Sequence, residues 1–78
     1  MTQTTIRIAR PIRTKQGVLI RTEVLGEWFV RPEEWPNGGK MPYIHQQLVN
    51  AQEEEPGLDW HLETRGTDVS WHRQEAAR

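Results

Sequence analysis

The sequence contains no cysteine among its 78 residues. This absence excludes a disulfide framework, a zinc site built from thiolates and a cysteine nucleophile. The sequence also has no apolar run close to the roughly 20 residues that a membrane span requires. Its first ten residues lack the apolar stretch of about 7–15 residues that is found in an export signal. We therefore expect a cytoplasmic protein with no membrane partner and no cofactor.

An excess of charge of one sign is also absent, since the formal net charge is -1 and 35% of the residues are apolar. Disorder usually combines low hydrophobicity with high net charge, so we expect residues 1–78 to form a single domain, with frayed ends at 1–4 and 73–78. Six basic and two acidic residues give positions 1–31 a balance of +4, whereas four basic and nine acidic residues give positions 32–78 a balance of -5. Either the two halves fold together and neutralise each other, which is the simpler interpretation, or a bipolar surface orients a charged partner.

Alternating apolar residues predict the first half of the fold. Apolar residues fall at alternate positions in 5–13 (Ile6, Ile8, Ile12) and in 18–25 (Val18, Ile20, Val24), and the turn-like residues between these segments indicate a hairpin. Gly26 should end the second strand, and 27–31 should form a third extended segment. Pro11 has no backbone N–H to donate to a sheet, so the first strand should lie at an edge or contain a bend.

The second half contains one helical pattern followed by two strands. Apolar residues repeat at helical spacing over 42–55, and a proline and a glycine end the pattern. Segments 58–63 and 68–73 then flank a predicted turn. This order predicts an α+β fold, namely a small antiparallel sheet of four to five short strands, in the order β-β-(β)-α-β-β, with one helix packed on it.

The register of the last hairpin decides which of its side chains meet. A turn over 64–67 would place Trp60 opposite Trp71, and Leu62 opposite Val69. All four large apolar side chains would then share one face of the sheet, which favours this register.

The same register would bring together three weak metal candidates, Asp59, His61 and His72, on the exposed face. Two imidazoles and a carboxylate form a ligand set that zinc accepts. Their spacing matches no familiar metal-binding motif, however, and such residues are ordinary on a solvated strand face. We therefore predict no metal site.

Motifs for catalysis are lacking as well. Ser70 is the only serine, and although His61 would neighbour it in the predicted hairpin, nothing supplies an oxyanion hole. The glycines at 38–39 have neither the spacing nor the following serine or threonine of a phosphate-binding loop. We predict that the chain is not an enzyme and has no catalytic residues.

Four tryptophans in so short a chain indicate binding instead. Trp28 and Phe29 are adjacent in an extended segment, so their side chains must point to opposite faces. Trp35 lies in a stretch without apolar periodicity, where it is either an exposed anchor or the plug of a loop folded back over the core. We predict a protein-binding module in which exposed aromatic anchors are combined with orienting arginines. The predicted contacts are Trp28, Phe29, Trp35, Arg10, Arg13 and Arg31.

Nucleic acid is the alternative partner. Basic side chains line the first hairpin, and a two-stranded ribbon fits a major groove. The residues predicted for this mode are Arg7, Arg10, Arg13, Lys15 and Arg21. The acidic second half disfavours it, because domains that bind phosphate backbones usually carry a clear positive charge. A structural homodimer is a third alternative.

The chain resembles small phage- or plasmid-encoded proteins that bind and redirect a large host machine, such as RNA polymerase, a CRISPR complex or a nuclease. The resemblance is one of general character: small size, no cysteine, no catalytic motif and the aromatic-rich stretch 26–42. The resemblance implies a cytoplasmic inhibitor or regulator whose partner is a larger protein or protein complex.

Overall fold

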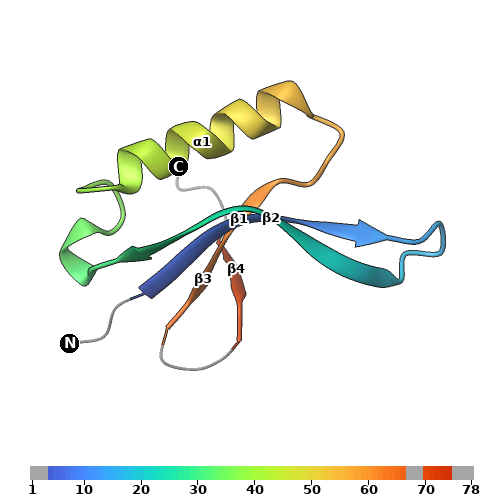
Figure 1. The fold of residues 1–78 in the computed structure, drawn as a ribbon, viewed down its shortest axis with the longest axis horizontal. Helices are drawn as coiled ribbons and strands as arrows, with labels where there is room; N and C mark the ends of the chain where they lie inside the picture. The colour runs from blue at the N-terminus through green and yellow to red at the C-terminus, as the bar shows by residue number, and fades with distance from the viewer. Residues whose placement is uncertain (1–3, 67–69, 75–78) are drawn as a thin grey trace.

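One helix lies across one face of a four-stranded antiparallel sheet (Figure 1). The structure is a computed structural model that describes residues 4–66 and 70–74. Its elements are, in chain order, β1 (Thr4–Arg13), β2 (Leu19–Val30), the 3-10 helix η1 (Pro32–Glu34), α1 (Met41–Glu54), β3 (His61–Arg65) and β4 (His72–Gln74). The predicted α+β class is confirmed, although β1 and β2, with 10 and 12 residues, are longer than the short strands expected.

The strands lie in the order β2-β1-β3-β4, and the core fills the space between this sheet and α1. Residues paired across strands share a face. Ile6 is paired with Trp28 on β2, and Ile8 is paired with Leu62 on β3, so all four face the helix. The buried apolar cluster consists of Ile6, Ile8, Val30, Met41, Ile44, Ala51, Trp60 and Leu62. In the described part of the chain, no helix combines the length and the apolar character needed to cross a membrane.

Gly26 does not end the second strand, contrary to the sequence prediction. β2 continues through it, so the predicted third segment at 27–31 belongs largely to the same strand. The ladder between β1 and β2 shifts by one residue at this point and leaves Leu25 as a bulge. A bulge bends a strand without ending it. Glycine suits the position because the Trp28 indole occupies the space that a Cβ would need.

Replacing Gly26 with alanine should lower the free energy of unfolding by about 1–3 kcal/mol. A Cβ at this position would lie 2.5 Å from Cη2 of Trp28. The indole cannot move aside freely, because it packs edge-to-face on Tyr43 with ring centroids 6.2 Å apart. Chemical denaturation measures the change. Gly57→Ala is the control, since a Cβ there meets nothing within 4 Å, and equal losses in the two variants would contradict this account.

β1 and β2 extend past the layer covered by the helix as a two-stranded arm, defined here as residues 10–25 (Figure 1). β3 pairs with β1 only from Thr5 to Ala9, so the arm consists of two strands alone. The sequence pattern placed Val18, Ile20 and Val24 on one face of its second strand, an arrangement typical of a half-buried strand. Instead, Val18, Ile20 and Val24 are 62%, 62% and 41% exposed. Alternation identified the strand correctly, but α1 does not reach far enough to cover it.

Pro11 lies where the pairing of β1 with β3 has ended. β1 runs between β2 and β3, so the prediction of an edge strand is wrong for the strand as a whole. Beyond Ala9, however, β3 no longer accompanies it, and one side of β1 is open at Pro11. The missing N–H therefore falls in the one part of β1 that can tolerate it.

The last hairpin has a different register from the predicted one. Leu62 pairs with Gln74, rather than with Val69, which lies outside the described residues. Trp60 is buried in the core, whereas Trp71 contacts arginines on the other face of the sheet, so these two indoles do not form the predicted cross-strand pair. The predicted turn over 64–67 is also wrong, because β3 continues to residue 65.

Two arginines account for the position of Trp71. The guanidinium carbons of Arg7 and Arg65 lie 4.0 and 4.6 Å from the centroid of its ring. Each such cation–π contact contributes about 0.5–2 kcal/mol. Arg7 belongs to the first strand, so the pattern of the hairpin alone could not reveal this partner.

Some positions of the predicted frayed ends belong to strands. Thr4 belongs to β1, and residues 73–74 belong to β4. The remaining positions of both predicted tails, 1–3 and 75–78, lie outside the described residues.

Candidate functional site

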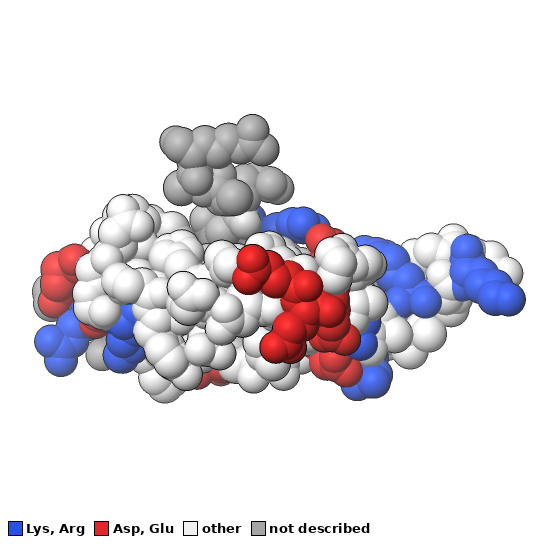
Figure 2. Space-filling model, turned by 90° about the horizontal axis from the view of Figure 1, so that it is seen from above, with Lys and Arg blue, Asp and Glu red and all other residues white. Residues whose placement is uncertain are grey.

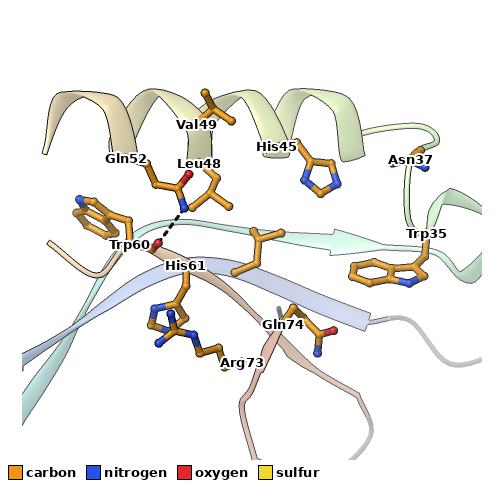
Figure 3. A pocket seen from close by; sticks show the side chains of 11 residues that line it. Trp35, Asn37, His45, Leu48, Val49, Gln52, Trp60, His61, Arg73 and Gln74 are labelled. Carbon is orange, nitrogen blue, oxygen red and sulfur yellow. Dashed lines mark hydrogen bonds between the residues drawn. The ribbon is translucent and has the colours of Figure 1, made fainter. Parts of the chain in front are cut away.

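A groove of about 590 Å³ lies between α1 and the β3–β4 side of the sheet (Figure 3). Figure 3 places Trp35 and Trp60 toward opposite ends, with Leu48 and His45 pointing from the helix toward the sheet. The lining residues are Trp35, Asn37, His45, Leu48, Val49, Gln52, Trp60, His61, Leu62, Arg73 and Gln74.

The segment that carries Trp35 is fixed to the rest of the fold by hydrogen bonds. The ring of His45 on α1 makes a 3.1 Å contact between Nε2 and the carbonyl oxygen of Pro36. The Glu34 carboxylate accepts a 3.1 Å hydrogen bond from the backbone N–H of Lys40. This bond holds the pKa of Glu34 below its ordinary value, chiefly because the N–H stabilises the charged form. Trp35 is nevertheless 43% exposed, so the segment presents its indole rather than burying it.

Most polar side chains that line the groove already have partners within the protein. Gln52 Nε2 donates to the carbonyl of Trp60 at 3.2 Å, which also ties the end of α1 to the start of β3. Arg73 donates two hydrogen bonds, of 2.8 and 2.9 Å, to the Asp59 carboxylate. Gln74 Nε2 donates to the hydroxyl of Thr64 at 2.8 Å. The lining that remains available is therefore mainly apolar: Trp35 and Val49 are exposed, and they lie beside Leu48 and the largely buried Trp60 and Leu62.

A polar network lies on the face of the sheet opposite the helix, and of its members His61 also lines the groove. His61 is buried, and its two ring nitrogens contact the Asp59 carbonyl at 2.7 Å and the Glu63 carboxylate at 2.9 Å. Glu63 also accepts a 2.6 Å hydrogen bond from Arg7, the same arginine that lies over Trp71. Burial alone would raise the pKa of Glu63, but the hydrogen bonds from His61 and Arg7 outweigh it and lower the pKa. The pKa of Asp59 is also lowered, first by its hydrogen bonds with Arg73.

The aromatic residues predicted as contacts do not form one surface. Trp28 packs against the core, so little of it is available to a partner. Phe29 is 62% exposed, and it is paired with Thr5 on the face opposite the helix. Trp35 lies at the groove on the helix side. The alternation of Trp28 and Phe29 thus follows the expectation, and of the three aromatic side chains only Trp35 belongs to the groove.

The arginines predicted as protein contacts are also separated. Arg31 is exposed and directly follows β2. Arg10 and Arg13 lie on the arm. The Arg10 guanidinium lies 5.5 Å from the Trp60 ring centroid and bonds to Glu23 at 2.9 Å. The Arg10 guanidinium is therefore already engaged in contacts within the chain.

The basic residues predicted for nucleic-acid binding divide into two groups. Arg7 and Arg10 are ion-paired with acidic residues and contact tryptophan rings. Arg13, Lys15 and Arg21 remain exposed on the arm. Figure 2 shows basic side chains along the projecting arm and a cluster of acidic side chains beside it. Three exposed cations are few compared with the roughly 6–10 phosphate contacts typical of strong duplex binders.

The three weak metal candidates do not form one group: Asp59 Oδ2 lies 3.9 Å from His61 Nδ1, but His72 lies apart from both. His72 pairs with Thr64, whereas His61 and Glu63 occupy the alternate face of β3, so His72 lies on the other side of the sheet from His61. Across residues 4–66 and 70–74, no three histidine, aspartate or glutamate side chains form a group that could hold a metal ion. The predicted clustering is wrong because it depended on the predicted register of the last hairpin.

The sequence did not indicate the groove itself. The helical spacing of the apolar residues over 42–55 places Leu48 on the apolar face of the helix and Val49 beside that face. The sequence contained no sign that the sheet would leave space beneath them. Val49 is 43% exposed, and an apolar residue beside the buried face of a helix was the one available signal.

Comparisons of the chain with protein-family models, with curated proteins and with solved structures found no match.

Proposed function

We propose that this chain is a non-enzymatic protein-binding module that accepts an apolar side chain of a larger protein in the groove between Trp35 and Trp60. The observation that supports this proposal is the combination of an apolar lining with polar neighbours that are already hydrogen-bonded. Its volume of about 590 Å³ falls within the range of known ligand pockets. An exposed tryptophan at the rim is a frequent anchor of protein interfaces.

The charges around the groove favour a protein partner over a nucleic acid. Glu53, Glu54 and Glu55 are exposed at the end of α1. These carboxylates would repel a phosphate backbone, while they would attract a basic rim on a protein. The exposed cations of the arm do not line the groove.

The nature of the partner is proposed from the sequence alone. The lack of cysteine and the resemblance in character to small phage- or plasmid-encoded proteins support a cytoplasmic regulator or inhibitor. On this proposal the partner is part of a host machine such as RNA polymerase, a CRISPR complex or a nuclease.

Trp35→Ala should weaken capture of the partner by about 30-fold or more, as expected for the loss of a tryptophan hot spot. The measurement is affinity capture from lysate of the source organism, with and without nuclease, followed by titration of the captured protein. Val49→Arg should have a similar effect, because the charged side chain would obstruct the groove while its own position stays solvated.

Phe29→Ala is the matched control, since this ring is also exposed but lies on the other face of the sheet. It should leave capture unchanged. Loss of capture in Phe29→Ala but not in Trp35→Ala would reject the groove as the binding surface. Loss of the partner on nuclease treatment would show that nucleic acid bridges the two proteins.

A further inference from the structure

The outer edge of β2 on the arm carries a self-complementary sequence. β2 is the outermost strand of the sheet, and no described strand pairs with its outer side. Residues 19–25 read Leu-Ile-Arg-Thr-Glu-Val-Leu. On either side of Thr22 stand a charged residue and then two apolar residues, and the two charges are of opposite sign. An isologous contact between two copies requires such an arrangement, because the two-fold axis places each residue on one side of Thr22 opposite the corresponding residue on the other side in the second copy.

We propose that two copies of this chain pair their β2 strands in antiparallel orientation about Thr22. The two sheets then become one continuous sheet through backbone hydrogen bonds between the arms. Thr22 lies opposite Thr22 of the second copy, and the other pairs are Arg21 with Glu23, Ile20 with Val24, and Leu19 with Leu25. This contact uses a surface remote from the groove, so it stands independently of the proposed function.

The apolar residues of this segment are exposed in the single chain. Leu19, Ile20, Val24 and Leu25 are 51%, 62%, 41% and 52% exposed. An open strand edge that carries apolar side chains is a template for pairing with another chain. Pairing about Thr22 would bring each of them beside an apolar residue of the second copy.

The charged residues are positioned to complete this contact. Glu23 is paired across strands with Arg10, and Arg21 with Ile12, so both charges lie on one face of the arm. Arg21 Nη2 is 3.8 Å from Glu23 Oε2 within the chain, and the two side chains are 64% and 37% exposed. In the antiparallel pair each Glu23 would gain the Arg21 guanidinium of the second copy directly opposite it, and opposite charges at such positions attract.

Other open edges of the sheet are less suited to pairing. Pro11 removes an N–H from the open side of β1 in the arm. At the far end of β2, Lys40 Nζ donates to the carbonyl oxygen of Phe29 at 2.5 Å and occupies that part of the edge. The three central pairs, from residue 21 to residue 23, are regular, whereas the ladder shifts of β2 fall at Ile20 and Leu25, in the outer apolar pairs.

Charge exchange tests the pairing. Sedimentation equilibrium of the full chain, from low micromolar to millimolar concentration, should show a monomer–dimer equilibrium. Arg21→Glu alone and Glu23→Arg alone should each weaken it by roughly tenfold or more, because each creates two facing like-charge pairs. An equimolar mixture of these two variants should restore association as a heterodimer, and the double variant R21E/E23R should restore the homodimer. Circular dichroism confirms that each variant is folded.

Cross-linking tests the register without altering a charge. The chain has no native cysteine, so Thr22→Cys supplies a single thiol at the proposed two-fold axis. Directly opposite residues have Cα atoms about 4.5–5.5 Å apart, which suits a disulfide. Mild oxidation should therefore link Thr22→Cys chains into dimers. Val24→Cys is the matched control, because its two copies would lie about 13 Å apart along the strands.

A monomer at every concentration would overturn the proposal. So would preferential cross-linking of Val24→Cys, which would place the axis elsewhere, or a mixture of the two charge variants that associates no better than each alone. None of these results depends on the groove, since Trp35→Ala should leave the dimer unchanged.

Discussion

Trp60→Ala is expected to lower the free energy of unfolding by about 3–5 kcal/mol, the usual cost of removing a buried aromatic side chain. Trp60 is only 6% exposed and belongs to the apolar cluster between α1 and the sheet. Its Nε1 also donates to Glu55 at 3.2 Å, next to the end of the helix. A domain of this size has a total stability of about 4–12 kcal/mol, so the variant should be close to unfolding at room temperature.

The measurement is urea denaturation followed by circular dichroism, with Trp35→Ala as the control. Both substitutions remove an indole from the lining of the groove, but Trp35 is 43% exposed. We expect its loss to cost about 1 kcal/mol or less. Equal losses in the two variants would mean that Trp35 is part of the core, and the groove could not then serve as an accessible binding site.

Glu63→Gln is expected to cost about 2 kcal/mol, below the roughly 3–5 kcal/mol for breaking a fully buried ion pair, because this pair is only partly buried. The side chains of Glu63 and Arg7 are each 16% exposed, and their closest atoms are 2.6 Å apart. Loss of the carboxylate leaves the positive charge of Arg7, which lies over the Trp71 ring, without its negative partner. It also removes the charged partner of His61. The stability change is measured by urea denaturation at pH 7.

Asp59→Asn is the matched control, because the Asp59–Arg73 pair has similar geometry but side chains that are 49% and 48% exposed. Such exposed pairs contribute about 1 kcal/mol or less. If Asp59→Asn destabilised the protein as much as Glu63→Gln, the contrast between buried and exposed pairs would not explain the stability of this sheet.

The same carboxylates set the acid response. Folding lowers the pKa of Glu63 and of Asp59 from their ordinary values of 4.5 and 3.8. The unfolded chain therefore takes up protons at a higher pH than the folded one. The two carboxylates contribute fully to the free energy of unfolding above their ordinary pKa values, and this contribution is lost as the pH falls through their lowered pKa values in the folded protein. In Glu63→Gln the decline of stability below about pH 4.5 should be shallower than in the native chain.

Local pattern sufficed to identify most elements of this protein. The helix predicted over 42–55 is α1 (Met41–Glu54), and the apolar alternation of 5–13 marks the inward residues of β1. Opposite orientations for Trp28 and Phe29 followed from strand geometry alone. These properties depend on neighbours within a few residues, and the sequence records them directly.

Only the tertiary structure decided how these elements are combined. Leu62 lies opposite Ile8, and Trp71 lies against Arg7, so residues of the last hairpin are positioned by contacts with the first strand that the local pattern does not record. Which apolar residues are buried likewise depends on where α1 lies, because the helix covers the body of the sheet and leaves the arm and the rim of the groove in solvent. Periodicity shows which residues can share a face, but whether another element covers that face depends on contacts between distant parts of the chain.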